Sequence, residues 1–204
     1  MHKNDERILV ALRGFLFDDE QLTFQGLLTG KRRINTYMLR LRDFFEARRG
    51  DAEENPEWKQ PIPYTIIQRG DEVFLYERLK AGGEQRLHNQ LSIGIGGHMN
   101  NLYPEDDFRS NLLANLDKEL HEELDIEASV LSVPKVIGLI NDDMDEVGRV
   151  HFGILCIVQV PEGTEVTVRE TDKLDGYWVR IQDLQKTPLF ERLERWSKLA
   201  VEIL

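Results

Sequence analysis

Three glutamates of one segment are the residues best suited to chemistry. Glu119, Glu122 and Glu123 stand at positions i, i+3 and i+4, so on an α-helix they share one face. Like charges at this spacing destabilise an exposed helix by a few tenths of a kcal/mol per pair. A bound hard divalent cation makes the same cluster stabilising, because Mg²⁺ prefers carboxylate oxygen and water as ligands. The cluster indicates either a cation site or a solvated acidic face, and composition alone favours the solvated face.

A glycine-rich turn and a long helix must position these carboxylates. Gly94, Gly96 and Gly97 precede the helix and could bring backbone groups close to a metal or a phosphate. We expect the helix over about residues 104–124, with Pro104 at the first helical position. Its core stripe is made of leucines: Leu113, Leu116, Leu120 and Leu124.

The remaining periodicity predicts a mixed α/β fold in which strands outnumber helices. Segment 51–63 contains three prolines and is predicted to be a loop or linker, and 141–148 is predicted to be an acidic loop. The expected helices are 34–49 and 189–204, and the expected strands are 7–17, 64–68, 73–76, 91–95, 130–139, 149–160, 166–170 and 177–180.

Composition limits the class of protein. The 204 residues carry 26 Lys and Arg against 37 Asp and Glu, a net charge of −11, and 41% are hydrophobic. This acidic balance argues against binding to nucleic acid polymers or anionic membranes. One cysteine excludes an intramolecular disulfide or a zinc site built from several thiolates. No apolar run approaches the ~20 residues of a membrane span, so we expect a cytoplasmic protein.

The surplus acid is concentrated in two places. Residues 105–127 carry nine acids and two bases, and residues 141–149 carry four acids and one base. These two segments account for nearly the whole net charge of −11. A polyvalent cation site needs such a distribution, although a dense solvated helix also produces it.

The segment from Lys118 to Ile126 resembles the Nudix box, G-x5-E-x7-R-E-U-x-E-E-x-G-U, where U is aliphatic. All three glutamates and both aliphatic positions match, and Gly97 matches the opening glycine. Residues 176–184 resemble the strand and turn that often precede the last helix of a Nudix domain. The resemblance covers roughly 61–204, and the chain most resembles bacterial MutT-type proteins described as predicted phosphoesterases.

The match departs from the box in its scaffold half. The first box glutamate falls at Ser110 when counted from Lys118 and at Tyr103 when counted from Gly97, so the loop carries a seven-residue insertion. Lys118 replaces an arginine and cannot form the arginine fork. Asp125 replaces a glycine, and aspartate tolerates positive φ better than most residues. The acids that could pair with the lysine are Glu105, Asp106 and Asp107.

The resemblance implies a Nudix-like α/β/α sandwich with a mixed sheet over residues 61–204. Residues 1–60 would then be an N-terminal extension of strand and helix that packs on or caps this core. The implied activity is Mg²⁺- or Mn²⁺-dependent hydrolysis of a diphosphate linkage in a nucleoside diphosphate derivative or a similar small phosphorylated molecule. Water attacks phosphorus in this reaction. A homodimer is compatible with the sequence.

By resemblance, the metal ligands and catalytic residues are Glu119, Glu122 and Glu123, with the carbonyl of Gly97 as a fourth ligand. The carboxylate that orients or deprotonates the water is either Glu119 or an acid from another loop, and the sequence does not choose between them.

Substrate contacts are expected outside the helix. Asp142 and Asp143 are the candidates for the outside acid, with a solvated turn as the alternative. His98 follows the glycine turn and is a candidate contact for phosphate or the catalytic water, the alternative being a loop-stabilising role. His151 is expected to be structural or at the rim of the pocket, and Cys156 to be a small core residue.

Two other functions remain open. A Nudix-fold binding or regulatory module without turnover is favoured by the altered first glutamate, Lys118 and Asp125, and opposed by the three retained glutamates. An isomerase of isoprenoid diphosphates would need a cysteine near the pocket. Because Cys156 lies within a predicted buried strand, we rank this reading lowest.

Overall fold

Two compact units make up the protein, which we describe from a computed structural model covering residues 2–78, 90–104, 107–169 and 174–204. Each unit is assembled from three stretches of the chain: unit 1 from Met1–Tyr64, Gly96–Asp117 and Val136–Leu155, and unit 2 from Thr65–Ile95, Lys118–Lys135 and Cys156–Leu204. Five elements of the described chain continue from one unit into the other: β4 (Trp58–Arg69), β7 (Gly94–Gly96), α4 (Phe108–Glu123), β9 (Lys135–Asn141) and β10 (His151–Gln159).

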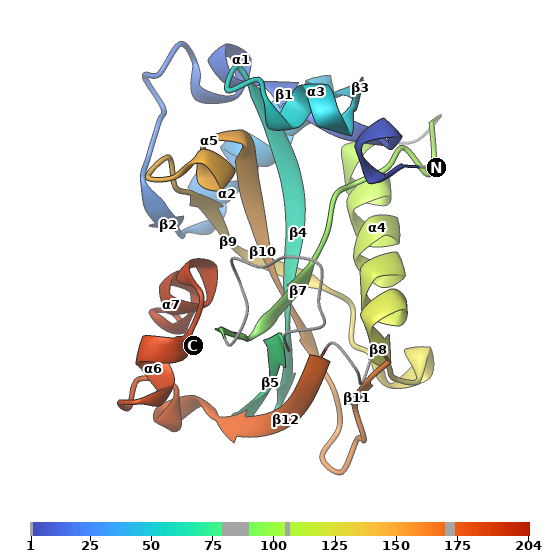
Figure 1. The fold of residues 1–204 in the computed structure, drawn as a ribbon, viewed down its shortest axis with the longest axis vertical. Coiled ribbons are helices and arrows are strands. Elements are labelled where there is room, and N and C mark those ends of the chain that lie inside the picture. Colours follow the sequence, from blue (N-terminus) through green and yellow to red (C-terminus); the bar gives the residue numbers. More distant parts are fainter. Residues whose placement is uncertain (1, 79–89, 105–106, 170–173) are drawn as a thin grey trace. The chain divides into compact units, whose positions relative to one another are not determined.

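Unit 1 contains two antiparallel strand pairs besides its parts of β4 and β10 (Figure 1). Strand β1 (Arg7–Leu12) pairs with β3 (Phe45–Arg48) and meets β4 at Ala11 opposite Lys59. Strand β2 (Gly26–Leu28) pairs with β9 (Lys135–Asn141). The α-helices of this unit, besides the start of α4, are α1 (Arg13–Phe17), α2 (Lys31–Arg40), α3 (Arg49–Glu53) and α5 (Glu146–Val150).

An aromatic cluster forms part of the core of unit 1. The rings of Phe17, Phe24, Tyr37 and Phe152 pack mostly edge to face, with centroids 5.4–6.3 Å apart. Such pairs contribute about 0.5–1.5 kcal/mol each beyond their buried area. The cluster fastens α1 and α2 to the start of β10, the strand on which His151 stands.

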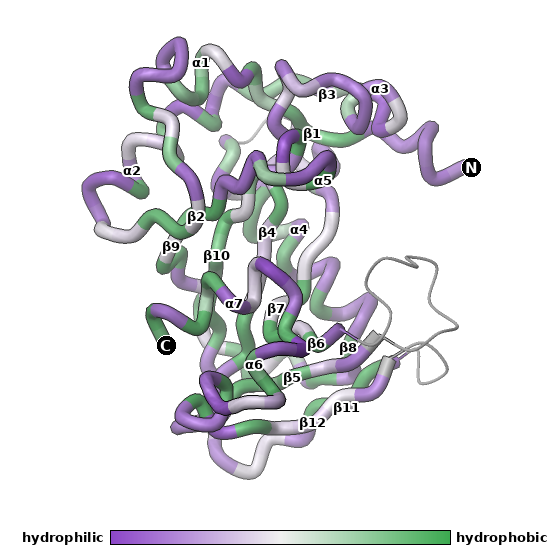
Figure 2. Tube along the Cα trace, turned by 60° about the vertical axis from the view of Figure 1, so that its left-hand side comes forward, coloured by the Kyte–Doolittle hydropathy of each residue, from purple (hydrophilic) through white to green (hydrophobic). Residues whose placement is uncertain are grey.

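Strand β10 owes its position to an almost continuous apolar sequence. Six of its first seven residues and Val158 are buried, and Figure 2 shows most of the strand in the colours of hydrophobic residues. A strand buried on both faces reads as a continuous apolar run rather than an alternating one. Cys156 is buried here as expected, and burial raises its pKa to about 12.

Unit 2 is built around a hairpin. Strands β4 and β5 (Glu72–Arg78) are joined through Gly70 and Asp71, and Gly70 takes a φ of 58° that favours glycine. Strand β12 (Leu174–Arg180) pairs antiparallel with β5 along seven residues. The other elements are β6 (Leu91–Ser92), which pairs with β5, β8 (Leu124–Asp125), which pairs with β11 (Thr167–Val168), and the helices α6 (Leu189–Arg192) and α7 (Arg195–Val201); β7 (Gly94–Gly96) lies where the chain passes into unit 1.

The mixed α/β class, the 64–76 hairpin and the box helix are confirmed. The helix predicted over 34–49 is wrong beyond residue 43, because Phe45–Arg48 pairs with β1 as strand β3. The predicted loop 51–63 is also wrong, since it contains the end of α3 and the start of β4. Pro61 and Pro63 are tolerated in β4 because residues two apart place their missing N–H groups on the same strand edge.

Smaller corrections concern the ends of elements. The second half of 7–17 forms helix α1 rather than strand, and helix α5 occupies the end of the predicted acidic loop. The single helix predicted over 189–204 is two, because the side chain of Glu194 accepts hydrogen bonds from Trp196 N and Ser197 N and caps α7. Across the described residues, no helix combines the length and apolar character that a membrane crossing requires.

Candidate metal sites

The three box glutamates lie in the last turns of α4, within unit 2. The Glu119 side chain is 13% exposed and that of Glu122 is 59% exposed, so the cluster extends from a sheltered position to solvent. The Nζ atom of Lys118 lies 3.5 Å from Glu119 Oε1 and 3.9 Å from Glu122 Oε1. The lysine in the arginine position of the box therefore contacts the acids of the cluster itself.

Strand pairing accommodates the second departure, Asp125. The main-chain N–H of Arg169 donates to the carbonyl of Glu123 at 2.9 Å, and its Nε donates to the carbonyl of Leu124 at 2.7 Å. Asp125 itself pairs with Thr167 as part of β8. It is absent from the positive-φ residues of the described chain, so this position does not need the left-handed conformation that glycine would supply.

Two buried asparagines of α4 fasten the inserted loop. Asn115 accepts a hydrogen bond from the N–H of Asn100 and donates to its carbonyl, both at 2.8 Å. Asn111 does the same for Tyr103, both at 3.0 Å. Each side chain thus satisfies both backbone groups of a loop residue, as a neighbouring strand would. Asn100 and Tyr103 of this loop are therefore fixed to α4 within unit 1.

The start of α4 differs from the prediction because Asp107 is its cap. Asp107 Oδ1 accepts from the N–H of Ser110 at 3.0 Å, and the helix begins at Phe108 rather than at Pro104. This backbone hydrogen bond lowers the pKa of Asp107. Of the acids expected to pair with Lys118, Glu105 and Asp106 lie outside the described residues.

Close backbone packing sets the position of the glycine turn in unit 1. A Cβ on Gly96 would lie 2.4 Å from the carbonyl oxygen of Pro63, so no larger residue fits. Met99 is buried, and its carbonyl accepts from the N–H of Leu9 at 2.7 Å. Gly97 and His98 are held between these two anchors.

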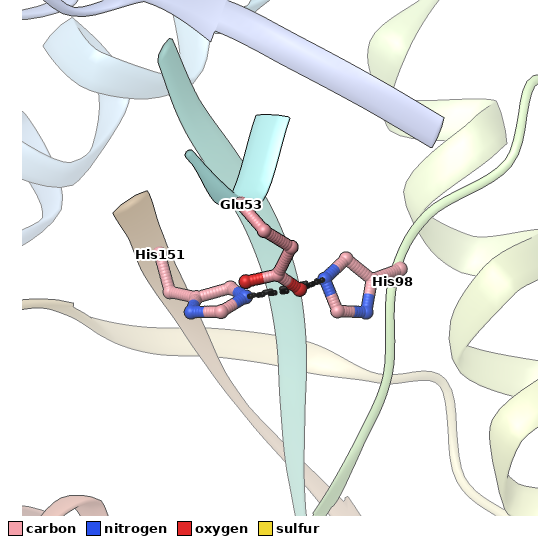
Figure 3. A group of neighbouring side chains, drawn as sticks. All are labelled: Glu53, His98 and His151. Carbon is pink, nitrogen blue, oxygen red and sulfur yellow. Dashed lines mark hydrogen bonds and ion pairs between the residues drawn. The ribbon is translucent and has the colours of Figure 1, made fainter. Parts of the chain in front are cut away.

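His98 meets Glu53 and His151 in unit 1, where the three side chains converge (Figure 3). Glu53 Oε1 lies 3.4 Å from His98 Nε2 and 4.0 Å from His151 Nε2. The two Nε2 atoms are 3.1 Å apart. The residues come from the end of α3, the loop after β7 and the start of β10, so the tertiary fold alone brings them together.

Burial and hydrogen bonding set the protonation of this triad. Burial lowers the pKa of His98, and burial together with the neighbouring His98 lowers the pKa of His151 to about 4. The hydrogen bond from His98 is the main cause that lowers the pKa of Glu53 to about 2. At neutral pH the triad is therefore two neutral imidazoles and one carboxylate, all able to donate electron pairs.

A backbone contact selects the tautomer of His151. Its Nδ1 lies 2.7 Å from the carbonyl oxygen of Val147, and this pair forms a hydrogen bond only when Nδ1 carries the proton. In the neutral ring, Nε2 then bears the lone pair and faces Glu53 and His98.

Asp143 lies at the centre of an ion-pair network in unit 1. Its carboxylate accepts from Arg13 at 3.0 and 3.1 Å, from Lys59 at 2.7 Å and from Gln25 at 2.8 Å. Burial raises its pKa, but these hydrogen bonds outweigh burial and hold the pKa well below the usual range. Asp142 is 3% exposed. Contact of either aspartate with a substrate stays a prediction.

Lys59 connects this network to the triad. Its side chain is fully buried, and besides Asp143 its Nζ donates to the carbonyls of Gly148 at 3.0 Å and His151 at 3.4 Å. A Cβ on Gly148 would lie 1.7 Å from the carbonyl oxygen of Asp142. The backbone that leads into β10 therefore has little conformational freedom, and its conformation sets the position of His151.

Sequence patterns gave no signal for Glu53 or Lys59. Both fall in or beside the segment predicted to be a loop, where a glutamate and a lysine are ordinary surface residues.

A hollow of about 700 Å³ lies elsewhere in unit 1, beside α1 and α2. Its lining includes Arg40, whose guanidinium pairs with Asp18 at 2.8 Å. No residue of the triad or of the box lines it, so it does not mark either cluster.

Comparison with known proteins extends over the whole chain. Protein YmaB from Bacillus subtilis (strain 168) is 48% identical over 205 residues, which is all of both chains. The solved structure of Tm1382, named as a Nudix hydrolase, is 30% identical, has a TM-score of 0.79 and is covered to 97%, as is this chain. DR0079 from Deinococcus radiodurans shares the fold at 13% identity and a TM-score of 0.50, over 70% of this chain and 81% of its own. No family model matches the chain.

Proposed function

This chain belongs to the Nudix hydrolase family, and we propose that it hydrolyses a diphosphate linkage with Mg²⁺ or Mn²⁺. The proposed substrate is a nucleoside diphosphate derivative or a similar small phosphorylated molecule. The observation that carries the proposal is the retained set of Glu119, Glu122 and Glu123 on one helix of a chain similar to Tm1382 along 97% of its length.

The donor set fits such a metal. Glu119, Glu122 and Glu123 supply only carboxylate oxygens, which Mg²⁺ and Mn²⁺ prefer, and the exposure of Glu122 leaves room for water and substrate. Gly97 remains the proposed fourth ligand from its match to the box alone. When bound, the metal supplies charge neutralisation and a more acidic water.

The chain's own residues would orient water and substrate. The Glu119 side chain is only 13% exposed, and it is a candidate for orienting the attacking water. His98, Asp142 and Asp143 remain proposed substrate contacts. The oxygens of Asp143 already accept from Arg13 and Lys59, so a substrate would meet a carboxylate with its charge already balanced.

One observation favours the second candidate, a binding module without turnover. The ammonium group of Lys118 lies within 4 Å of Glu119 and Glu122, where it competes electrostatically with a metal cation. An ammonium group at this distance weakens metal binding, and a chain with weak metal binding could retain a ligand without cleaving it.

A hydrolysis screen tests the proposal. The full chain is incubated with Mg²⁺ or Mn²⁺ and nucleotides, nucleotide sugars, dinucleoside polyphosphates and coenzymes, and released phosphate or nucleotide is measured. We expect metal-dependent turnover that falls by about 100-fold or more in E122Q, the scale of losing one catalytic electrostatic contact. The matched control E127Q, an exposed glutamate beyond the helix, should keep full activity.

Two results would count against this proposal. Binding of a panel member without cleavage would support the module instead, and turnover unchanged in E122Q would remove the box from the reaction.

A further inference from the structure

We propose that Glu53, His98 and His151 form a transition-metal site that binds Zn²⁺ and uses none of the three box glutamates. The proposal concerns unit 1 alone and does not depend on the hydrolytic reaction. It rests on the geometry of the three ligand atoms, their chemical type and the contacts that orient them.

The distances between the ligand atoms suit a small cation. Tetrahedral Zn²⁺ bonded at about 2.0–2.2 Å to nitrogen and oxygen needs ligand atoms roughly 3.3–3.5 Å apart. The observed separations among Glu53 Oε1, His98 Nε2 and His151 Nε2 are 3.1, 3.4 and 4.0 Å. A shift of about half an ångström by the partly exposed Glu53 would close the 4.0 Å separation, and the two imidazoles would need to part by a few tenths of an ångström.

The chemical type of the ligands selects the metal. Two imidazole nitrogens and one carboxylate suit Zn²⁺ and its neighbours in the first transition row, whereas Mg²⁺ prefers oxygen ligands alone. The same combination of two histidines and one glutamate holds zinc in catalytic sites with an open fourth position. We therefore expect the triad and the box to differ in metal preference.

Further hydrogen bonds and ion pairs of the three ligand residues orient them, as such contacts do in metal sites. The bond from His151 Nδ1 to Val147 O turns Nε2 toward the triad, and Lys59 fixes the His151 main chain. Arg49 Nε contacts Glu53 Oε1 at 3.5 Å and limits the motion of that carboxylate. Arg49 adds a positive charge near the site, and its contact with Glu6 at 3.4 Å balances this charge.

A metal bound to the triad would have an open coordination position that a further ligand could reach from solvent. Three protein ligands leave one position of a tetrahedral ion for water or an anionic ligand. The Glu53 side chain is 35% exposed, while those of His98 and His151 are only 11% and 9% exposed. The open position therefore faces the glutamate side of the triad.

The competing interpretation is a metal-free hydrogen-bonded cluster in which His98 Nε2–H donates to His151 Nε2 across 3.1 Å. Both interpretations use the same side chains. They differ in whether a stoichiometric metal binds with nitrogen ligands, and that difference can be measured.

Cobalt titration separates them. The full chain, first treated with a chelator, is titrated with Co²⁺ while visible absorption is recorded, and Zn²⁺ is then added in competition. We expect the intense bands of four-coordinate Co²⁺, removed by one equivalent of Zn²⁺. Zinc affinity should fall by at least about 100-fold in H98Q and H151Q, since even outer-shell changes cost 10–100-fold.

Matched variants identify the site. H121Q changes a histidine outside the triad and E122Q changes the box, so both should retain the cobalt bands. Bands lost in E122Q but kept in H98Q would overturn the proposal, as would their absence from the unaltered chain.

The variant E53Q tests the site even if replacement of a histidine prevents folding. His151 is buried, whereas E53Q alters a partly exposed ligand and leaves both imidazoles in place. Zn²⁺ should raise the Tm of the unaltered chain, because it binds only the folded state, and should raise that of E53Q much less. An equal rise in both would contradict the site.

Discussion

Replacement of Lys59 by methionine tests the network that positions His151. The fully buried ammonium donates to Asp143 and to the carbonyls of Gly148 and His151. In K59M, Asp143 keeps its two hydrogen bonds from Arg13, so it does not become an unpaired charge. The lost stability then comes from the carbonyls of Gly148 and His151, which lose their hydrogen bonds from Lys59.

The expected magnitude follows from those groups. Each buried acceptor left unsatisfied costs about 1–3 kcal/mol, so the two carbonyls together account for about 2–6 kcal/mol. Methionine preserves most of the apolar stem, so we expect the free energy of unfolding to fall by about 3–5 kcal/mol. Urea denaturation followed by circular dichroism measures it.

A second lysine supplies the control. Lys118 is 31% exposed and its ion pairs are 3.5 and 3.9 Å long, so K118M should cost less than about 1 kcal/mol. If K59M and K118M lose equally little stability, the buried lysine does not hold the chain at the start of β10, and the account of how His151 is aimed is incorrect.

Three further perturbations test the surrounding structure. G148A should lower the free energy of unfolding by about 3 kcal/mol or more, because its Cβ would lie 1.7 Å from the carbonyl oxygen of Asp142; an unchanged Tm would contradict this close approach. N115A should lower the free energy of unfolding, measured by urea denaturation, by about 2–4 kcal/mol. The main-chain N–H and C=O of Asn100 would lose their 2.8 Å hydrogen bonds to the Asn115 side chain. Because the pKa of Asp143 is lowered on folding, its contribution is present above the ordinary value of 3.8 and is lost as the pH falls below it. The stability of D143N should therefore depend less on pH between about 5 and 2 than that of the unaltered chain, and parallel pH profiles would refute this assignment.

The box helix and the hairpin could be predicted because their signals are local. Leu116, Leu120 and Leu124 recur at helical spacing and are buried, and Gly70 marks a turn between two alternating runs. Asp107 shows the limit of such reasoning. A capping residue and a proline three positions earlier gave competing starts, and the side-chain hydrogen bond to Ser110 decided between them.

Strand β3 could not be predicted from its own residues. Phe44 and Phe45 extend the helical spacing of the preceding segment, and only pairing with β1, where Phe45 lies opposite Val10, makes Phe45 part of a strand. Long-range pairing overrides local propensity there.

The triad lay beyond sequence reasoning for a similar cause. His98 and His151 are 53 residues apart, and neither is separated from Glu53 by a spacing typical of metal ligands. The expectation that His151 is structural or at a pocket rim, and that His98 touches phosphate or steadies a loop, treated each residue singly. Their joint position depends on how α3, the inserted loop and β10 pack.

The location of bound manganese tests the central claim most directly. A crystal of the full chain soaked in Mn²⁺ is measured at the manganese absorption edge, where anomalous scattering marks the ion. The account predicts a peak within bonding distance of carboxylate oxygens of Glu119, Glu122 and Glu123. Manganese bound elsewhere, with these three carboxylates unligated at saturating Mn²⁺, would contradict the assignment of the box as the hydrolytic metal site.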